Sequence, residues 1–259
     1  MKTFKLSKIN SGRLKEFSKR FFQDRRERTL QDLKVLEKSN PDDMRVRQKI
    51  AETYYQLGLG DLAVETFLSI AAHHEQAGFI LRAIDTCKNI LKIKPDWVDT
   101  NLKLSSLYEK VEMKTEAANQ LRIAISHYAR AGDTDKTLDL ALDLVAIDPS
   151  NENRAKLAEI YQINGMSEEA IKEYEFLAKD ARFKKNYDKL LHFYELILPH
   201  RPTNTAIIKD LCILYLRKKQ PERATHILEQ YKVIQDAAFT DLAQKARLMS
   251  EALKRQKGK

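Results

Sequence analysis

The sequence predicts an all-α fold of stacked helical repeats. One pattern of tyrosine, alanine and proline returns every 53 or 54 residues along the chain. Its members are Tyr54, Tyr108, Tyr161 and Tyr215; Ala63, Ala117, Ala170 and Ala224; and Pro41, Pro95, Pro149 and Pro202. The 259 residues include only seven glycines and six prolines, which is too few for a β fold rich in turns. Because a fixed period is typical of repeat arrays, each unit is expected to bury its apolar face against its neighbours.

Residues 1–40 are predicted to form a basic N-terminal arm and a capping helix. They contain twelve Lys or Arg and five acids, a net charge of +7, whereas the whole chain has +9. A helix is expected to begin at Ser11 and to end near Lys38. Apolar residues recur at helical spacing in two stripes, one at Leu14, Phe17 and Phe21 and the other at Leu30, Leu33 and Leu36. The second stripe is predicted to lie on the first repeat, and the first half of the segment is a candidate for an exposed arm.

Residues 41–235 are predicted to form the repeat array, in four units that we call repeats 1 to 4. The bounds of these units are 41–94, 95–148, 149–201 and 202–235. In repeat 1, Asp42 or Asp43 is expected to cap the first of three helices. Gly78 is expected to end the second helix, and the third helix should end before Pro95. The same order of helices is expected in repeats 2 and 3.

The last part of the chain is predicted to close the array. Repeat 4 is expected to be a plain helix pair, from Thr205 to Val233. A further helix, from about Ala237 to Lys254 within the C-terminal segment 236–259, has apolar residues at spacings of three and four: Phe239, Leu242, Ala246, Met249 and Leu253. A capping helix over the last repeat, followed by a basic tail, is the favoured interpretation. The alternative is the coiled-coil seam of a homodimer.

The order of residues within repeat 1 resembles a known family. A large apolar residue, a small one and an aromatic are followed by a second small residue, a second aromatic and a proline: Ile50, Ala51, Tyr54, Ala63, Phe67 and Pro95. This order resembles the tetratricopeptide repeat (TPR) over about residues 41–235. The resemblance implies a right-handed, TPR-like α-solenoid of stacked antiparallel helices that acts as a scaffold or adaptor for proteins, without enzymatic activity.

Two features depart from the family. The tryptophan of the family pattern is absent, with Arg47 and Asn101 at its places, and the period is 54 residues where the family has about 34. The added residues are themselves patterned, since Gly78 to Pro95 and Gly132 to Pro149 both span 17 residues. We therefore expect a bacterial-type TPR protein with expanded three-helix units of about 54 residues. In repeat 3, Lys185 stands where the first two repeats have a glycine.

No arrangement of residues predicts catalysis, a cofactor or a metal. Gly58 and Gly60 lack the preceding strand and the following lysine that a phosphate-binding loop needs. No acid or cysteine completes a metal-ligand set with His73 and His74 at helical spacing. We therefore expect neither an enzyme nor a cofactor-binding protein.

The cysteines and the apolar runs give an expected location. Cys87 and Cys212 lie within apolar helical stretches, so buried thiols in a reducing compartment are expected. No apolar run reaches the ~18 residues of a membrane helix, and no apolar stretch of the signal-peptide kind follows the basic N-terminus. These features favour a cytoplasmic protein.

The inner face of the predicted array is the candidate binding site. In the repeat frame, candidate partner contacts on this face are Arg45, Gln48, Glu52, Tyr55, Lys103, Glu159 and Lys209. Members of the resembled family that grip a C-terminal carboxylate use Lys and Asn at such positions, and only Lys209 fits that pattern here. The mixed surface around Tyr55 therefore favours a partner's helix or extended peptide over a chaperone tail.

The basic arm is a second candidate site. Its cations are Lys15, Lys19, Arg20, Arg25, Arg26 and Arg28, with phenylalanines between them. The arm could bind an acidic protein or an anionic membrane surface, or it could be a solvated cap whose phenylalanines lie in the core of repeat 1. Nucleic acid is the least favoured partner, because the repeat body has no matching positive stripe.

Overall fold

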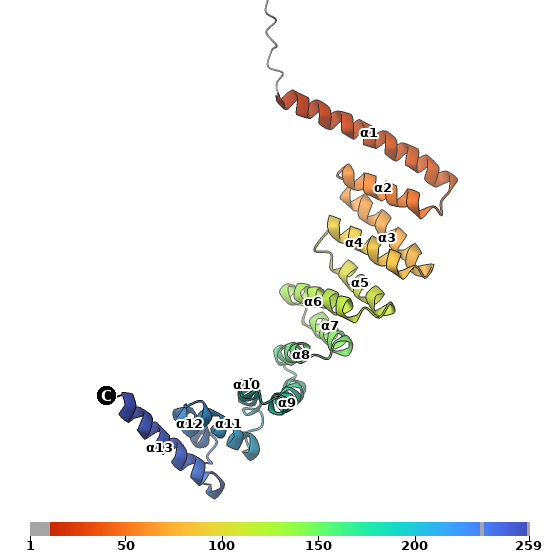
Figure 1. The fold of residues 1–259 in the computed structure, drawn as a ribbon. Helices are drawn as coiled ribbons and strands as arrows, with labels where there is room; N and C mark the ends of the chain where they lie inside the picture. The colour runs from red at the N-terminus through yellow and green to blue at the C-terminus, as the bar shows by residue number, and fades with distance from the viewer. Residues whose placement is uncertain (1–10, 234–235, 258–259) are drawn as a thin grey trace, which may run out of the picture. The chain divides into compact units, whose positions relative to one another are not determined.

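A computed structural model describes residues 11–233 and 236–257, with side chains described for residues 20–233 and 236–256. It divides into two compact halves, an N-terminal half of residues 1–127 and a C-terminal half of residues 128–259. The described residues form thirteen α-helices and one short 3-10 helix, with no strand among them (Figure 1). None of these helices is long and apolar enough to cross a membrane.

The helices begin at matching places in successive repeats. The N-terminal half contains α1 (Ser11–Ser39), α2 (Met44–Gln56), α3 (Gly60–Gln76), α4 (Ile80–Ile93), α5 (Val98–Lys110) and most of α6 (Lys114–Ala131). The C-terminal half continues with α7 (Thr134–Ile147), α8 (Asn151–Ile163), α9 (Ser167–Phe183), α10 (Tyr187–Ile197), α11 (Thr205–Arg217), α12 (Pro221–Gln230), η1 (Ala237–Phe239) and α13 (Thr240–Lys257). The first helix of each repeat has 13 residues.

Within each half, the helix contacts join neighbours in the chain. In the N-terminal half these contacts join α1 to α2, α2 to α3, α3 to α4 and α4 to α5 (Figure 1). In the C-terminal half they run in the same way from α7 through to α13. Contacts between chain neighbours are the property that defines a stacked array. The predicted all-α fold of stacked helices is therefore confirmed.

Small side chains lie where the first two helices of a repeat meet. The two small positions of the frame hold Ala51 and Ala63, Ser105 and Ala117, Ala158 and Ala170, and Cys212 and Ala224, all at most 2% exposed. The Ser105 hydroxyl donates to the carbonyl oxygen of Ala117 at 3.1 Å, and the Cys212 thiol makes the matching contact with the carbonyl of Ala224 at 3.7 Å. Such contacts form only when the two helices lie close together. Large side chains at these positions would keep the helices apart. The small residues of the repeated pattern therefore lie at the contacts between the first and second helices.

The turns within the repeats use left-handed backbone. Residues with positive φ, between 55° and 79°, end the first and second helices: Gly58, Gly78, Glu112, Gly132, Gly165, Lys185, Lys219 and Lys232. Lys185 adopts φ 55°, the conformation expected of the glycine that it replaces. Four of these turns therefore have a side chain where glycine would be unstrained.

The helix starts agree with the sequence in most places. Asp43 is the cap of α2, and its carboxylate accepts a hydrogen bond from the N–H of Arg45 at 2.9 Å. Asn186 and Asn204 cap α10 and α11 in the same manner. The final helix begins later than predicted, because Asp236 caps a 3-10 turn and the α-helix starts at Thr240.

Helix α1 buries only part of the second predicted stripe, and its first half is exposed at Phe21. Leu33 is buried against α2, but Leu36 is 54% and Phe21 58% exposed. Helix α1 packs mainly against α2 among the described helices, so a single helix covers most of its buried row of side chains. The side chains of Leu14 and Phe17 lie outside the described residues.

The C-terminal helix packs on repeat 4. Helix α13 contacts α12 and α11, and Phe239 and Ala246 are buried there. Leu242 and Met249 are half-buried against the same cluster. Four of the five predicted apolar positions thus lie in or against the core.

Candidate functional site

Two grooves occupy the same place in repeats 1 and 3. The repeat-1 groove has a volume of about 330 Å³ and is lined by Met44, Arg45, Gln48, His74, Arg82, Asp85, Thr86 and Asn89. The repeat-3 groove has a volume of about 520 Å³ and is lined by Asn151, Glu152, Ala155, Lys156, Glu159, Leu177, Asp180, Ala181, Lys184, Asn186, Lys189, His192 and Phe193. Most lining positions of the smaller groove have a partner at the same repeat position in the larger one.

The helix directions explain this geometry. The repeat-1 groove is lined by the start of α2, the end of α3 and the first half of α4. Since the end of α3 meets the starts of both other helices, α2 and α4 run parallel and α3 runs against them. The first and third helices form the walls and the second helix forms the floor. The repeat-3 groove uses α8, α9 and α10 in the same way.

Two small residues account for the greater volume in repeat 3. Gln48 of the first groove corresponds to Ala155, and His74 corresponds to Ala181. With these smaller side chains, the groove is also lined by Leu177 of the floor helix and Phe193 at the base of a wall, which are 1% and 8% exposed. The repeat-3 groove therefore has an apolar floor, whereas the repeat-1 groove is mostly polar.

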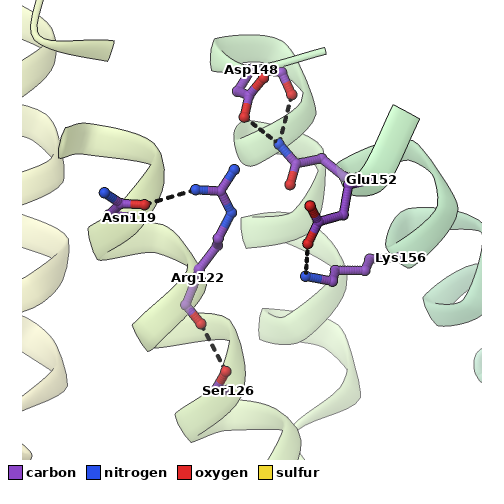
Figure 2. A network of polar contacts seen from close by, with 7 residues as sticks. Asn119, Arg122, Ser126, Asp148, Glu152 and Lys156 are labelled. Atoms are coloured by element: carbon purple, nitrogen blue, oxygen red, sulfur yellow. Dashed lines mark hydrogen bonds and ion pairs between the residues drawn. The ribbon is translucent and has the colours of Figure 1, made fainter. Parts of the chain in front are cut away.

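Ion pairs and hydrogen bonds form the rim of the repeat-3 groove. Asp180 accepts from the amide of Asn151 at 2.6 Å and pairs with Lys184 at 2.9 Å. The hydrogen bond from Lys184 lowers the pKa of Asp180 below its ordinary value. Lys156 pairs with Glu152 at 2.8 Å one turn along α8 (Figure 2). The rim is thus held in place before any partner binds.

Phe79 positions two groups of the repeat-1 groove. The Arg82 guanidinium lies over the Phe79 ring, 5.0 Å from its centre, and the His74 ring meets the same ring edge-on at 6.4 Å. His74 is 9% exposed, and its Nδ1 is buried without a hydrogen-bond partner in the described residues. Burial lowers the pKa of His74, with further lowering by Arg82 and His73. Burial and the two nearby cations thus favour the neutral form of the His74 imidazole.

Three of the predicted contacts lie in the two grooves. Arg45 and Gln48 line the repeat-1 groove, and Glu159 lines the repeat-3 groove. Glu52 accepts a hydrogen bond from the Gln48 amide at 3.0 Å, one turn further along α2. Tyr55 is 53% exposed near the end of the same helix. The candidates on α2 therefore form one continuous surface.

Lys103 and Lys209 lie outside both grooves. Lys103 and Lys110 both bind the carboxylate of Glu75, the latter at 2.5 Å, so these three residues join α5 to α3. The hydrogen bonds from Lys103 and Lys110 lower the pKa of Glu75. Lys103 thus has a structural partner that the sequence did not indicate. Lys209 is exposed on α11.

The described cations of the basic arm are exposed. Arg20, Arg25 and Arg28 are open to solvent, and Phe21 and Phe22 beside them are 58% and 53% exposed. The phenylalanines at this point do not lie in the core of repeat 1, which corrects that alternative. Arg26 is also exposed, yet its guanidinium donates to the carbonyl oxygen of Gln56 at 3.0 Å and ties α1 to the end of α2. The side chains of Lys15 and Lys19 lie outside the described residues.

Charged or amide groups occupy the positions of the missing tryptophan. Arg47 approaches Glu37 of α1 at 3.3 Å, and Arg154 pairs with Glu173 of α9 at 2.8 Å. Asn101 donates to the carbonyl of Trp97 at 3.2 Å at the start of α5. Arg47 and Arg154 thus connect neighbouring helices, whereas the Asn101 bond is local to the start of α5.

Polar contacts also fix the joint between α7 and α8. The Asn153 amide donates to the carbonyl and carboxylate oxygens of Asp148, both at 2.8 Å (Figure 2). Asn153 is 1% exposed, so these bonds satisfy a buried amide. They hold the start of α8, and hence one wall of the repeat-3 groove.

The structure shows no metal-binding cluster in its described part. No group of three His, Cys, Asp or Glu there could hold a metal ion. Cys87 and Cys212 are buried free thiols, and burial raises the pKa of Cys87 to about 11 and that of Cys212 to about 12. Both cysteines therefore behave as small packing residues.

The sequence did not single out Arg82, His74, Lys189 or Phe193 as site residues. The first and third helices build the walls together, whereas the sequence placed candidates only on first helices. Three of the four lining positions on α4 recur on α10, and this recurrence was the available signal. This recurrence can be recognised only when the third helix of a repeat is known to lie beside the first.

Among known proteins, several solved structures of helical-repeat proteins are similar to this chain. No family model matches the sequence, and no curated protein matches it. TPR-like repeats of a putative kinesin light chain from Podosopora anserina are 18% identical, covering 76% of this chain and 96% of that one with a TM-score of 0.34. YrrB, a TPR protein with an unusual peptide-binding site, is 15% identical over 70% of this chain and 90% of its own, with a TM-score of 0.23. BtubC from P. vanneervenii is 15% identical over 83% and 90%, with a TM-score of 0.30.

Proposed function

We propose that this protein is a non-enzymatic adaptor that binds a helix or an extended peptide of a partner protein along its inner helices. One observation supports the proposal above all: two grooves recur at the same repeat position, with walls from first and third helices. Small residues at the helix contacts already account for the packing of the repeats. The groove side chains are therefore available for recognition of a ligand.

The shape of the grooves suits a peptide segment. An open polar channel offers donors and acceptors to a peptide backbone, and an apolar floor offers a place for one side chain. Gln48 and Asn89 supply amides in repeat 1, and Leu177 and Phe193 supply apolar surface in repeat 3. Arg45, Glu52, Tyr55, Glu159 and Lys209 remain the proposed contacts on first helices, together with Lys103.

Blocking the grooves tests the adaptor function. In the full chain, Gln48→Trp with Ala155→Trp would fill both grooves, whereas Glu65→Trp with Lys172→Trp would place the same rings on exposed positions of α3 and α9. Quantitative capture from a cell extract should recover the same partner with the native chain and the α3/α9 variant, and lose it with the groove variant. Equal recovery by both variants would refute binding in the grooves.

The basic arm favours a second candidate function. Exposed Phe21 and Phe22 next to Arg20 and Arg25 have the composition of a segment that binds an anionic membrane surface. Each cation near such a surface contributes about 1 kcal/mol. Co-sedimentation with phosphatidylcholine vesicles, with and without phosphatidylserine, should show salt-sensitive binding that Arg20→Gln with Arg25→Gln weakens. Binding to RNA or to an acidic protein alone would favour the other partners of the arm.

We further propose a division of the chain that follows the repeats. Residues 1–40 are the arm and capping helix, 41–235 the array and 236–259 the closing helix and tail. Three helices form one expanded unit of the bacterial TPR type, because first helices begin at Met44, Val98, Asn151 and Thr205. Packing of α13 on α12 favours the capping role over a homodimer seam. The proposed location is the cytoplasm.

A further inference from the structure

From the repeat-1 groove we infer that the partner segment has an acidic side chain, Asp or Glu, which binds between Arg45 of α2 and Arg82 of α4. This inference rests on the proposed adaptor function and adds the chemistry of its ligand. The two arginines lie on opposite walls, near the starts of two parallel helices. A carboxylate placed between them would also meet the positive ends of both helix dipoles.

The charges of the groove leave this place open to an anion. Asp85 is the one acid that lines the groove among the described residues, and it pairs with Lys88 at 3.8 Å on the same helix. No acidic side chain in the described part of the chain lies within ion-pair distance of Arg45 or Arg82. The groove thus presents two unmatched guanidinium groups.

His74 adds a third donor on the floor. In a neutral imidazole one nitrogen has the proton and the other accepts a hydrogen bond. Its buried Nδ1 has no partner, and an unpaired acceptor is less costly there than an unpaired N–H. The proton therefore belongs on Nε2, the polar atom of this ring that remains for a ligand in the groove.

The Phe79 ring makes this a built site. The ring holds the Arg82 guanidinium 5.0 Å from its centre and also contacts His74 edge-on. Stacking of this kind fixes the guanidinium plane while its edge N–H groups stay free to bind a carboxylate. In repeat 3 the position of Arg45 is taken by Glu152, so that groove lacks the cation pair.

Two side-chain amides indicate that the ligand is an internal segment of the partner, which continues along the groove, and not the end of its chain. Gln48 donates to Glu52, and Asn89 accepts from Lys92 at 2.8 Å. These bonds leave the carbonyl of Gln48 and the N–H₂ of Asn89 free, which together match one peptide group. Both lie further along α2 and α4 than the arginines. A chain that continues beyond its acidic residue would use them.

Peptide binding to the full chain at physiological salt tests the inference. The probes are hexaglutamate and hexaglutamine with both termini blocked, and hexa-alanine with a free C-terminal carboxylate. Hexaglutamate should bind and move the His74 ring resonances in NMR spectra, whereas hexaglutamine should not. Arg45→Gln and Arg82→Gln should each raise the dissociation constant about tenfold, as expected for loss of one charge-assisted contact.

Two further variants separate a built site from general attraction of charge. Lys189 occupies in repeat 3 the position that Arg82 has in repeat 1. Lys189→Gln removes the same charge and should change the dissociation constant less than twofold. Phe79→Leu keeps every charge and should still weaken binding several-fold, with folding checked by circular dichroism. Equal weakening by Lys189→Gln, unmoved His74 resonances, or binding of hexa-alanine alone would overturn the inference. If the grooves still capture a partner but hexaglutamate does not bind, the adaptor function stands and the acidic ligand is wrong.

Discussion

Replacing Lys185 with glycine should stabilise the fold. The same replacement of a lysine inside a helix should destabilise it. Lys185 has φ 55°, and the turn is closed by a hydrogen bond from the N–H of Asn186 to the carbonyl of Ala181 at 2.8 Å. A side chain in this conformation costs about 1–2 kcal/mol. Glycine removes that strain but loses about 0.5–1 kcal/mol more conformational entropy on folding. Lys185→Gly should therefore stabilise the fold by roughly 0.5–1 kcal/mol.

The reverse change at Gly165 should destabilise by a similar amount. Gly165 has φ 72°, and a Cβ added there would meet no atom within 4 Å. Gly165→Ala thus introduces only conformational strain. We expect it to lower the free energy of unfolding by about 1 kcal/mol. Lys179→Gly, at an exposed position inside α9, is the control and should also lose about 1 kcal/mol.

Urea unfolding followed by circular dichroism measures all three variants. The account requires a gain for Lys185→Gly and losses for Gly165→Ala and Lys179→Gly. If Lys185→Gly lost stability like the Lys179 control, the left-handed turn at this joint would be wrong. The assignment of matching turns to successive repeats would then fail as well.

Three other predictions concern packing, charge and the thiols. Ala158→Leu, at a fully buried small position between α8 and α9, should cost about 1–3 kcal/mol in urea unfolding; no loss would mean that the helices do not meet there. The folded-state pKa of Glu75 is lowered by Lys103, so its contribution is present above the ordinary carboxyl pKa and disappears as pH falls through the folded value. Glu75→Gln should therefore lower the free energy of unfolding by about 1 kcal/mol at neutral pH. It should also weaken the loss of stability as the pH falls into the acid range, and an unchanged pH dependence would contradict this. Cys87 and Cys212, with thiol pKa values of about 11 and 12, should react with a thiol reagent only after unfolding, and fast labelling of the native protein would exclude their burial.

The sequence predicted the helices better than the surfaces they form. Small residues such as Ala51 and Ala158 mark where helices approach closely, because only small side chains permit that distance. Proline and glycine mark most helix ends for equally local reasons. Lys185 could be assigned from its place in the frame alone, since its own identity does not indicate a turn. These features depend on residues close together in the chain.

The grooves depend on residues that are far apart in the chain. Arg45 and Arg82 line one groove because α3 reverses the direction of the chain, whereas the contacts predicted from the sequence lie on first helices alone. Lys103 was predicted on the inner face, but its bond to Glu75 depends on how α5 lies against α3. Leu36 fitted a helical stripe, yet α1 packs mainly against α2, which leaves Leu36 54% exposed. Periodicity locates an apolar face and does not say how much of it is covered.

Photo-crosslinking from defined positions tests the central claim most directly. A photoreactive phenylalanine analogue at Gln48 or Ala155 lies in a groove, and the same group at Glu65 or Lys172 lies on exposed positions of α3 and α9. In cells, we predict that both groove positions capture the same partner protein through one continuous segment, and that the other two positions do not. Crosslinks from Glu65 and Lys172 alone, or equal crosslinks from all four positions, would contradict binding along the inner helices.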